Sequence, residues 1–133
     1  MIYLLDSNIC IYVINEHPKH VLDKFKKMRN ENITISSIVL SELAFGVYNS
    51  HHVEKNLLAL EKFSTPIKVL PYDENAAYYY GEIRAYLKKN GNPIGQLDAM
   101  IAAHALSINA TLVTNNTKEF SRVKNLKCEN WIL

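Results

Sequence analysis

Short apolar runs alternate along the chain with longer segments in which apolar residues recur every three or four positions. Short runs rich in β-branched residues predict strands, and the longer amphipathic segments predict helices. The predicted strands are residues 2–5, 33–35, 67–70, 111–113 and a last one near 128–131. The predicted helices are residues 7–14, 18–28, 38–48, 53–63, 74–89 and 97–108. Alternating strands and helices are typical of an α/β fold with a parallel sheet.

Polar residues mark the starts of several of these helices. Ser7 is expected to cap the first helix, because a serine hydroxyl accepts hydrogen bonds from free helical N–H groups. Ser36 and Ser37 offer caps for the third helix in the same way. Residues 114–120 are predicted to form a loop or a single helical turn.

The composition is that of one globular domain spanning residues 1–133. Hydrophobic residues make up 48% and charged residues 21%, which excludes intrinsic disorder. The formal net charge of +2 permits a polyanionic ligand without requiring one. The two cysteines lack metal-binding spacing, and the chain shows neither a signal-peptide pattern nor an apolar run long enough to span a membrane. We therefore expect a cytoplasmic protein.

Three acidic residues occur in unusually apolar surroundings. Asp6 follows an apolar run, at the expected carboxyl end of the first strand. Glu42 lies in a helix that is apolar almost all round, which predicts its burial, and Asp98 begins a helix of alanine and aliphatic residues. Taken singly, each acid has an ordinary explanation. Asp6 would start a turn or cap a helix, Glu42 would face solvent, and Asp98 would interact favourably with the helix dipole.

Taken together, the three acids predict a metal site. Each comes from a different strand–helix segment, and ligand sites of open parallel sheets lie at the carboxyl ends of the strands. Three converging carboxylates would repel one another and raise their pKa values unless a cation neutralised them. Mg²⁺ and Mn²⁺ prefer oxygen ligands, and carboxylate-bound Mg²⁺ usually acts on phosphates.

Four sequence blocks resemble the signature blocks of PIN domains, in the order and spacing of bacterial VapC-type toxins. They are residues 5–8 (LDSN), 36–43 (SSIVLSEL), 93–105 (PIGQLDAMIAAHA) and 113–120 (VTNNTKEF). The resemblance continues to residues 129–131 and covers essentially the whole chain. It implies a PIN-like α/β fold, in which helices flank a short parallel sheet on both sides. It also implies a metal-dependent ribonuclease with a buried acidic cluster.

The resemblance assigns roles to individual residues. Asp6, Glu42 and Asp98 match the catalytic acids that bind Mg²⁺, for which Mn²⁺ substitutes. Asn8 matches an asparagine that steadies the loop after the first strand, and Thr114 matches a hydroxyl residue that supports the cluster. A metal-bound water would attack the scissile phosphate in line, leaving 5′-phosphate and 3′-hydroxyl ends.

One position departs from the family pattern. Many PIN domains carry a fourth acid two residues after the threonine, where this chain has Asn116. Asn116 offers an oxygen ligand without a charge, and Glu119 is the acid close enough in sequence to substitute. We therefore expect one tightly held ion, with a second recruited by the substrate phosphate.

Several basic and aromatic residues are candidates for RNA binding. Arg84 and Lys88 lie near the Gly95 loop in sequence and are predicted RNA contacts. The basic residues at 24–29 form either a solvated helix face or a second RNA guide. The tyrosines at 78–80 could stack on bases, although at least one is expected to face the core.

The histidines offer no complete zinc site. His17 and His20 form one pair and His51 and His52 another, but nothing completes a tetrahedral set around either pair. His104 lies six residues after Asp98, off the face of that acid, and is expected to be packed or partly exposed.

The resemblance also implies partners. The helix at 53–63 and the one before it would line a groove for the C-terminal segment of a VapB-like antitoxin; the alternative is that they pack on the domain's own core. The substrate would be structured RNA, above all transfer RNA, including the anticodon loop of initiator tRNA. Homodimers are common in the family. Two alternatives stay open: a flap-type structure-specific DNA nuclease, against which the small size argues, and an inactive RNA-binding PIN domain, against which the three retained acids argue.

Overall fold

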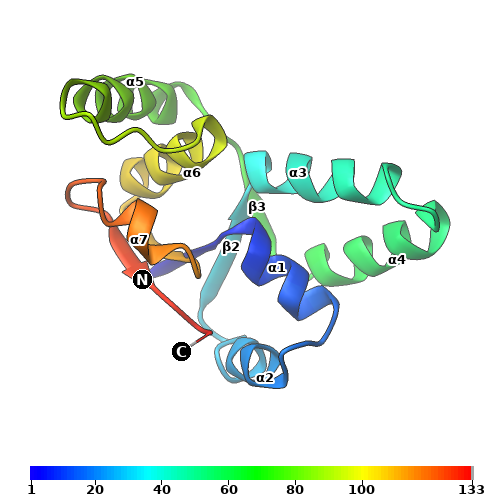
Figure 1. The fold of residues 1–133 in the computed structure, drawn as a ribbon. Helices are drawn as coiled ribbons and strands as arrows, with labels where there is room; N and C mark the ends of the chain where they lie inside the picture. The colour runs from blue at the N-terminus through cyan, green and yellow to red at the C-terminus, as the bar shows by residue number, and fades with distance from the viewer. Residues whose placement is uncertain (133) are drawn as a thin grey trace.

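Five short parallel strands form one sheet in the computed structural model, which describes residues 1–132 (Figure 1). The order across the sheet is β3-β2-β1-β4-β5, and every neighbouring pair is parallel. The strands are β1 (Ile2–Leu5), β2 (Asn32–Ser36), β3 (Lys68–Leu70), β4 (Thr111–Val113) and β5 (Lys127–Glu129). The predicted α/β fold with a parallel sheet is therefore confirmed.

Seven helices in the described part of the chain connect these strands. They are α1 (Ser7–Ile14), α2 (Lys19–Lys27), α3 (Ser37–Tyr48), α4 (Val53–Ser64), α5 (Glu74–Lys89), α6 (Gln96–Ser107) and α7 (Thr117–Phe120). Six of them match the helices predicted from periodicity, and α7 is a single turn within residues 114–120. Among residues 1–132, no helix is both long and apolar enough to cross a membrane.

Helices cover both faces of the sheet, as predicted. In Figure 1, α1 and α2 lie on one side of the sheet, and α5 and α6 lie on the other. α3 and α4 pack against each other as a hairpin, and both also contact α1. α6 contacts both α5 and β4, which explains why so much of this helix is buried. Its buried residues are Ala99, Ile101, Ala102, Ala103, His104 and Ala105.

The direction of the chain connections reverses at β1. This strand pairs with β2 on one edge and with β4 on the other. Leu5 lies opposite Val113, and the backbone N–H of Asp6 continues the pairing by donating to the carbonyl of Val113 at 2.9 Å. Asp6 and Thr114 therefore leave the sheet side by side, at the switch point where open α/β sheets bind their ligands.

The helix caps agree only in part with the prediction. Ser36 caps α3 as expected, because its Oγ accepts from the N–H of Ile38 at 3.1 Å. The prediction that Ser7 caps α1 is wrong. Asp6 is the cap, and its Oδ1 accepts from the N–H of Ser7 at 2.8 Å. The Ser7 hydroxyl is not used for capping because it bonds to α3 instead.

Candidate active site

Asp6 lies at the centre of the acidic site and is 6% exposed. Its Oδ2 accepts from Oγ1 of the fully buried Thr114 at 2.8 Å, while its Oδ1 accepts from the N–H of Ser7. Burial raises the pKa of Asp6, although these two hydrogen bonds act in the opposite direction. The bonds hold the Asp6 carboxylate in one orientation, and the bond from Thr114 joins the ends of two neighbouring strands.

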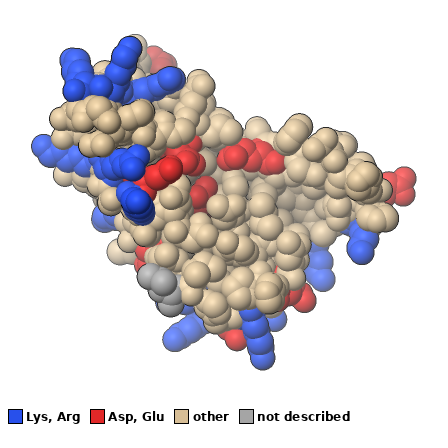
Figure 2. Space-filling model, viewed as in Figure 1, with Lys and Arg blue, Asp and Glu red and all other residues tan. Residues whose placement is uncertain are grey.

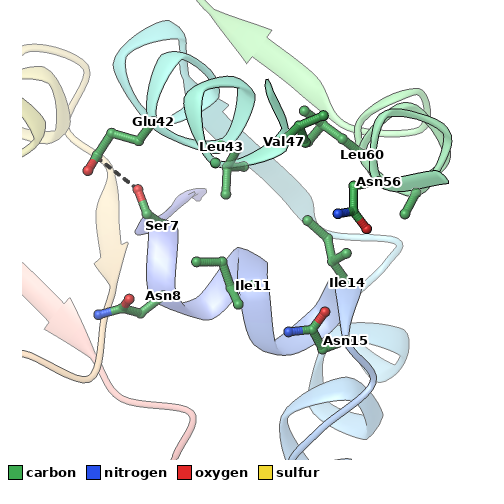
Figure 3. Close-up of a pocket in the computed structure, with 12 residues that line it drawn as sticks. Ser7, Asn8, Ile11, Ile14, Asn15, Glu42, Leu43, Val47, Asn56 and Leu60 are labelled. Atoms are coloured by element: carbon green, nitrogen blue, oxygen red, sulfur yellow. Dashed lines mark hydrogen bonds between the residues drawn. The ribbon is translucent and has the colours of Figure 1, made fainter. Parts of the chain in front are cut away.

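Glu42 is half-buried, so the prediction of a buried Glu42 is wrong. α3 packs with Val39, Leu43 and Val47 inward, and Phe45 is left 69% exposed. The helix is apolar on its outer face as well, and periodicity cannot distinguish an exposed apolar side chain from a buried one. The Ser7 hydroxyl donates to Oε1 of Glu42 at 2.9 Å, which turns the carboxylate toward α1 (Figure 3).

Asp98 lies in the first turn of α6 and is partly buried. Its pKa is raised from 3.8 to about 6, first by burial and then by the negative charges of Asp6, Glu119 and Glu42. A hydrogen bond between the carboxyl groups of Asp98 and Glu119 raises it further. The fold therefore brings the three predicted acids together with Glu119 into one electrostatically coupled cluster.

Asn116 takes part in this cluster by holding Glu119. Its Nδ2 donates to Oε2 of Glu119 at 3.1 Å, and its backbone N–H donates to Oγ1 of Thr114 at 3.0 Å. An amide therefore orients the fourth carboxylate. Sequence reasoning named both residues as possible ligands but missed their contact, which the Asn-x-x-Glu spacing at a helix start could have signalled.

Asn8 does not have the structural role that the resemblance implied. Among residues 1–132 it makes no side-chain hydrogen bond, and it lies exposed on the wall of a groove. The loop after β1 is held instead by the two bonds to the Asp6 carboxylate, from Ser7 and from Thr114.

The four carboxylates are close enough to act on one another electrostatically, but they do not converge on one point. Among the residues that the structure describes, no three His, Cys, Asp or Glu side chains are arranged to hold a single ion. Asp6, Glu42 and Glu119 are each turned to a hydrogen-bond donor of the protein. All the charged groups of the cluster are nonetheless hard oxygen donors, as Mg²⁺ and Mn²⁺ require.

A groove of about 350 Å³ runs from the acidic site between α1, α3 and α4 (Figure 3). Ser7 and Glu42 stand at one end, and the walls are mainly apolar. The lining residues include Ile11, Ile14, Leu43, Gly46, Val47 and Leu60. The sequence suggested that these two helices either pack on the core or line a groove. In the structure, α3 and α4 pack on the core and also line the groove.

A basic flank borders the acidic site on the opposite side. Figure 2 shows Lys and Arg side chains gathered over α5 and α7, next to the acidic patch. Arg84 and Lys88 are exposed on α5 and line a hollow of about 200 Å³ together with Pro93 and Ile94. Arg122 donates from Nη1 to the carbonyl of Pro93 at 3.1 Å and so holds this segment. Sequence reasoning did not identify Arg122.

The basic residues at 24–29 lie elsewhere. They belong to α2 and the turn after it, which lie on the other side of the sheet from α6 (Figure 1). Of the tyrosines, Tyr78 is 75% exposed, whereas Tyr80 packs against the core, which confirms that at least one faces inward. Tyr80 also anchors Arg84, whose guanidinium lies 5.8 Å from the ring centroid.

Short parallel strands, helices on both faces and carboxylates at the strand ends together define a PIN-type domain. The family model "PIN domain" matches residues 3–126. The chain belongs to the PIN domain family.

Its relatives within the family are VapC proteins. "Ribonuclease VapC2" of Rickettsia felis is 46% identical over 98% of both chains. "tRNA(fMet)-specific endonuclease VapC" of Shigella flexneri is 44% identical over 97% of both chains. A similar solved structure is that of VapBC2 from Rickettsia felis bound to a DNA fragment from its promoter. One of its chains superimposes on this chain with a TM-score of 0.93 and 45% sequence identity, covering 98% of this chain and 99% of that one.

Proposed function

We propose that this chain is the toxin of a type II toxin–antitoxin pair and an endoribonuclease that depends on Mg²⁺, with Mn²⁺ as a substitute. The observation that carries the proposal is the cluster of Asp6, Glu42, Asp98 and Glu119, in which burial and then the charges of the other acids raise the pKa of Asp98 to about 6. The family and the names of the relatives support ribonuclease activity.

The chemistry of the donor set, which consists of carboxylate oxygens, fits a hard divalent cation, although the carboxylates of the described residues do not converge on one point. Asp6, Glu42 and Asp98 would hold it, with Glu119 as a fourth ligand or as the support of a second ion. When bound, the cation polarises a phosphate oxygen and lowers the pKa of a water molecule, which supplies the nucleophile. It would also neutralise the repulsion that these carboxylates now experience.

The protein's own part in the reaction is to orient these carboxylates. Thr114 and the N–H of Ser7 hold Asp6, which is buried and therefore shielded from bulk water. The Ser7 hydroxyl holds Glu42. Prior orientation lowers the cost of gathering the ligands around an ion and a phosphate.

The substrate proposed is transfer RNA, and within it the anticodon loop of the initiator tRNA. The choice of initiator tRNA follows the names of two relatives, the tRNA(fMet)-specific endonucleases of Shigella flexneri and Salmonella typhimurium, which are 44% and 41% identical to this chain. The anticodon loop follows the family resemblance. The exposed Arg84 and Lys88, on the basic flank next to the acidic site, would contact RNA phosphates.

The inhibitor proposed is a VapB-like antitoxin whose C-terminal segment lies in the groove between α1, α3 and α4. Solved relatives named VapBC support such a partner, including VapBC-1 from Haemophilus influenzae, with a TM-score of 0.89 at 38% identity over the full length of both chains. Because Ser7 and Glu42 stand at the end of the groove, a basic side chain of the antitoxin would reach the acids there. Homodimerisation and a cytoplasmic location complete the proposal.

A cleavage assay with matched variants tests the activity. The purified chain should cut an initiator-tRNA anticodon hairpin with Mg²⁺ or Mn²⁺ and should be inactive with EDTA. Asp6→Asn should lower the rate by more than about a hundredfold, since it removes the negative charge of a metal ligand. Glu61→Gln, an exposed acid on α4, is the matched control and should change little. Equal cutting of a DNA hairpin would favour the flap-type nuclease, and RNA binding without cleavage would favour an inactive PIN domain.

A further inference from the structure

A buried hydrogen bond joins the helix that carries Asp98 to the residue that caps the helix that carries Glu42. His104, on α6, is 1% exposed, and its Nδ1 lies 2.7 Å from Oγ of the fully buried Ser36. Ser36 is the last residue of β2, and the same Oγ caps α3 by accepting from the N–H of Ile38. The bond therefore ties α6 to the first turn of α3.

An aromatic contact with Tyr72 also holds the imidazole in place. Tyr72 packs edge-on against the ring, with the ring centroids 5.9 Å apart and an interplanar angle of 89°. The backbone N–H of Tyr72 donates to Oγ of Ser37 at 3.0 Å, so the same residue also anchors the start of α3. Burial lowers the pKa of His104, against the opposing charge of Asp73. The neutral ring is then able to hydrogen-bond with the hydroxyl as donor or as acceptor.

We propose that His104 is a positioning residue that sets the distance between Asp98 and Glu42 through its bond to Ser36, and so tightens the binding of the divalent cation. Ser36 lies six residues before Glu42, and His104 lies six residues after Asp98. An α-helix is stiff, so a shift at one of its residues also moves the others. His104 therefore positions Asp98 through α6, and Ser36 positions Glu42 through the start of α3. Two acids on separate helices need such a constraint, because small errors in ligand placement weaken a metal site.

This inference rests on the proposed function, and direct measurement of Mn²⁺ affinity by calorimetry tests the two separately. His104→Leu removes the hydrogen bond at similar size, and His104→Asn keeps a polar atom near the position of Nδ1. Thr34→Val is the matched control. Thr34 is also buried in β2, at 1% exposed, and its Oγ1 donates to the carbonyl of Tyr3 at 2.9 Å.

His104→Leu should weaken Mn²⁺ binding by about three- to tenfold, the equivalent of one hydrogen bond. His104→Asn should recover most of that affinity. Thr34→Val should lower the melting temperature without changing Mn²⁺ affinity. At saturating Mn²⁺ the kcat of His104→Leu should return to within about twofold of the wild type, since positioning limits ligand assembly and not the chemical step.

Three outcomes decide the matter. If His104→Leu and Thr34→Val lose thermal stability alike and both keep the wild-type Mn²⁺ affinity, His104 is merely structural and the inference is overturned. If His104→Leu does not fold, Ser36→Ala removes the same bond, and unchanged Mn²⁺ affinity in that variant overturns the inference equally. Absence of Mn²⁺ binding to the wild-type chain would overturn the proposed function, and this inference with it.

Discussion

Asp98 is the residue on which burial and neighbouring charge act together. Its carboxyl group is partly buried, and the charges of Asp6, Glu119 and Glu42 all oppose its ionisation. The folded protein therefore binds a proton at Asp98 more tightly than the unfolded chain does, and the pKa rises from 3.8 to about 6. The charge pattern that favours a metal ion thus destabilises the metal-free fold at neutral pH.

Asp98→Asn should stabilise the metal-free protein at pH 7.5 and abolish cleavage. The raised pKa means that the contribution of Asp98 to stability is present below pH 4 and is lost as the pH rises through about 6. Solvent screening of a partly buried group reduces the effect to ~1 kcal/mol, or ~3–5 °C in melting temperature. Thermal melts in EDTA between pH 4 and 7.5 should show a flatter profile for Asp98→Asn. Asp23→Asn, exposed on α2, should follow the wild type, and a lower melting temperature for Asp98→Asn would contradict the cluster.

Asn116 and Glu119 together replace the fourth acid of the family pattern: Glu119 supplies the carboxylate and Asn116 orients it. Glu119→Gln should raise the Mg²⁺ concentration needed for half-maximal cleavage, because it removes a charge beside Asp98. Asn116→Asp should lower that concentration by adding charge. It should also lower the metal-free melting temperature, because the bond from Nδ2 to Glu119 is replaced by repulsion. A Mg²⁺ titration that is the same for both variants and the wild type would leave Asp6, Glu42 and Asp98 as the catalytic set.

At the scale of elements, the site has two chemically different flanks. α5, α7 and the segment at Pro93 supply the basic flank, whereas α1, α3 and α4 supply the apolar groove. Both flanks border the acidic cluster. On the basic side, α5 packs against α6, which carries Asp98, and on the apolar side the groove is lined by α3, which carries Glu42. This division suits two ligands, a polyanion on one side and an apolar peptide on the other.

The basic flank should account for much of the salt dependence of RNA binding. Arg84→Gln and Lys88→Gln should each weaken binding of the anticodon hairpin and reduce the slope of log K against log salt by ~0.7, as expected for one phosphate contact on single-stranded nucleic acid. Lys26→Gln on α2 is the matched control and tests the basic residues at 24–29 directly. Equal slopes for Lys88→Gln and Lys26→Gln would show that the flank on α5 has no special role.

At the scale of the whole molecule, the groove allows inhibition to be separated from activity. Gly46 lines the groove on α3, and a Cβ added there would meet no atom within 4 Å. Gly81 on α5 has equally open surroundings and is not part of this groove. Both positions are helical, so a side chain at either one should stabilise the helix by ~0.5–1 kcal/mol.

Gly46→Gln should therefore stay folded and active but escape the antitoxin. Each variant is co-expressed with the small protein encoded by the neighbouring gene, and growth and RNA cleavage are followed. Gly46→Gln should remain toxic because its side chain occupies the groove, whereas Gly81→Gln should be neutralised like the wild type. Neutralisation of both variants would place the antitoxin on another surface.

Sequence periodicity located the strands and helices because each depends on neighbouring residues, and apolar spacing records directly which face of an element is buried. The edge of the sheet shared by Asp6 and Thr114 was also predictable, since the carboxyl ends of parallel strands lie together. Where local signals compete, as in the capping of α1, the sequence pointed to Ser7 and the structure uses Asp6.

The tertiary structure decided the contacts that orient the site. Ser7 meets Glu42 across 35 positions of sequence, and His104 meets Ser36 across 68. Such pairs depend on how whole helices pack, which no local period encodes. The tertiary structure also decided that Glu42 is only half-buried. The outer face of α3 is apolar, and the sequence of such a face is the same whether another element or water covers it. The sequence thus identifies which residues form the candidate active site, whereas helix packing in the folded protein determines how their side chains are oriented.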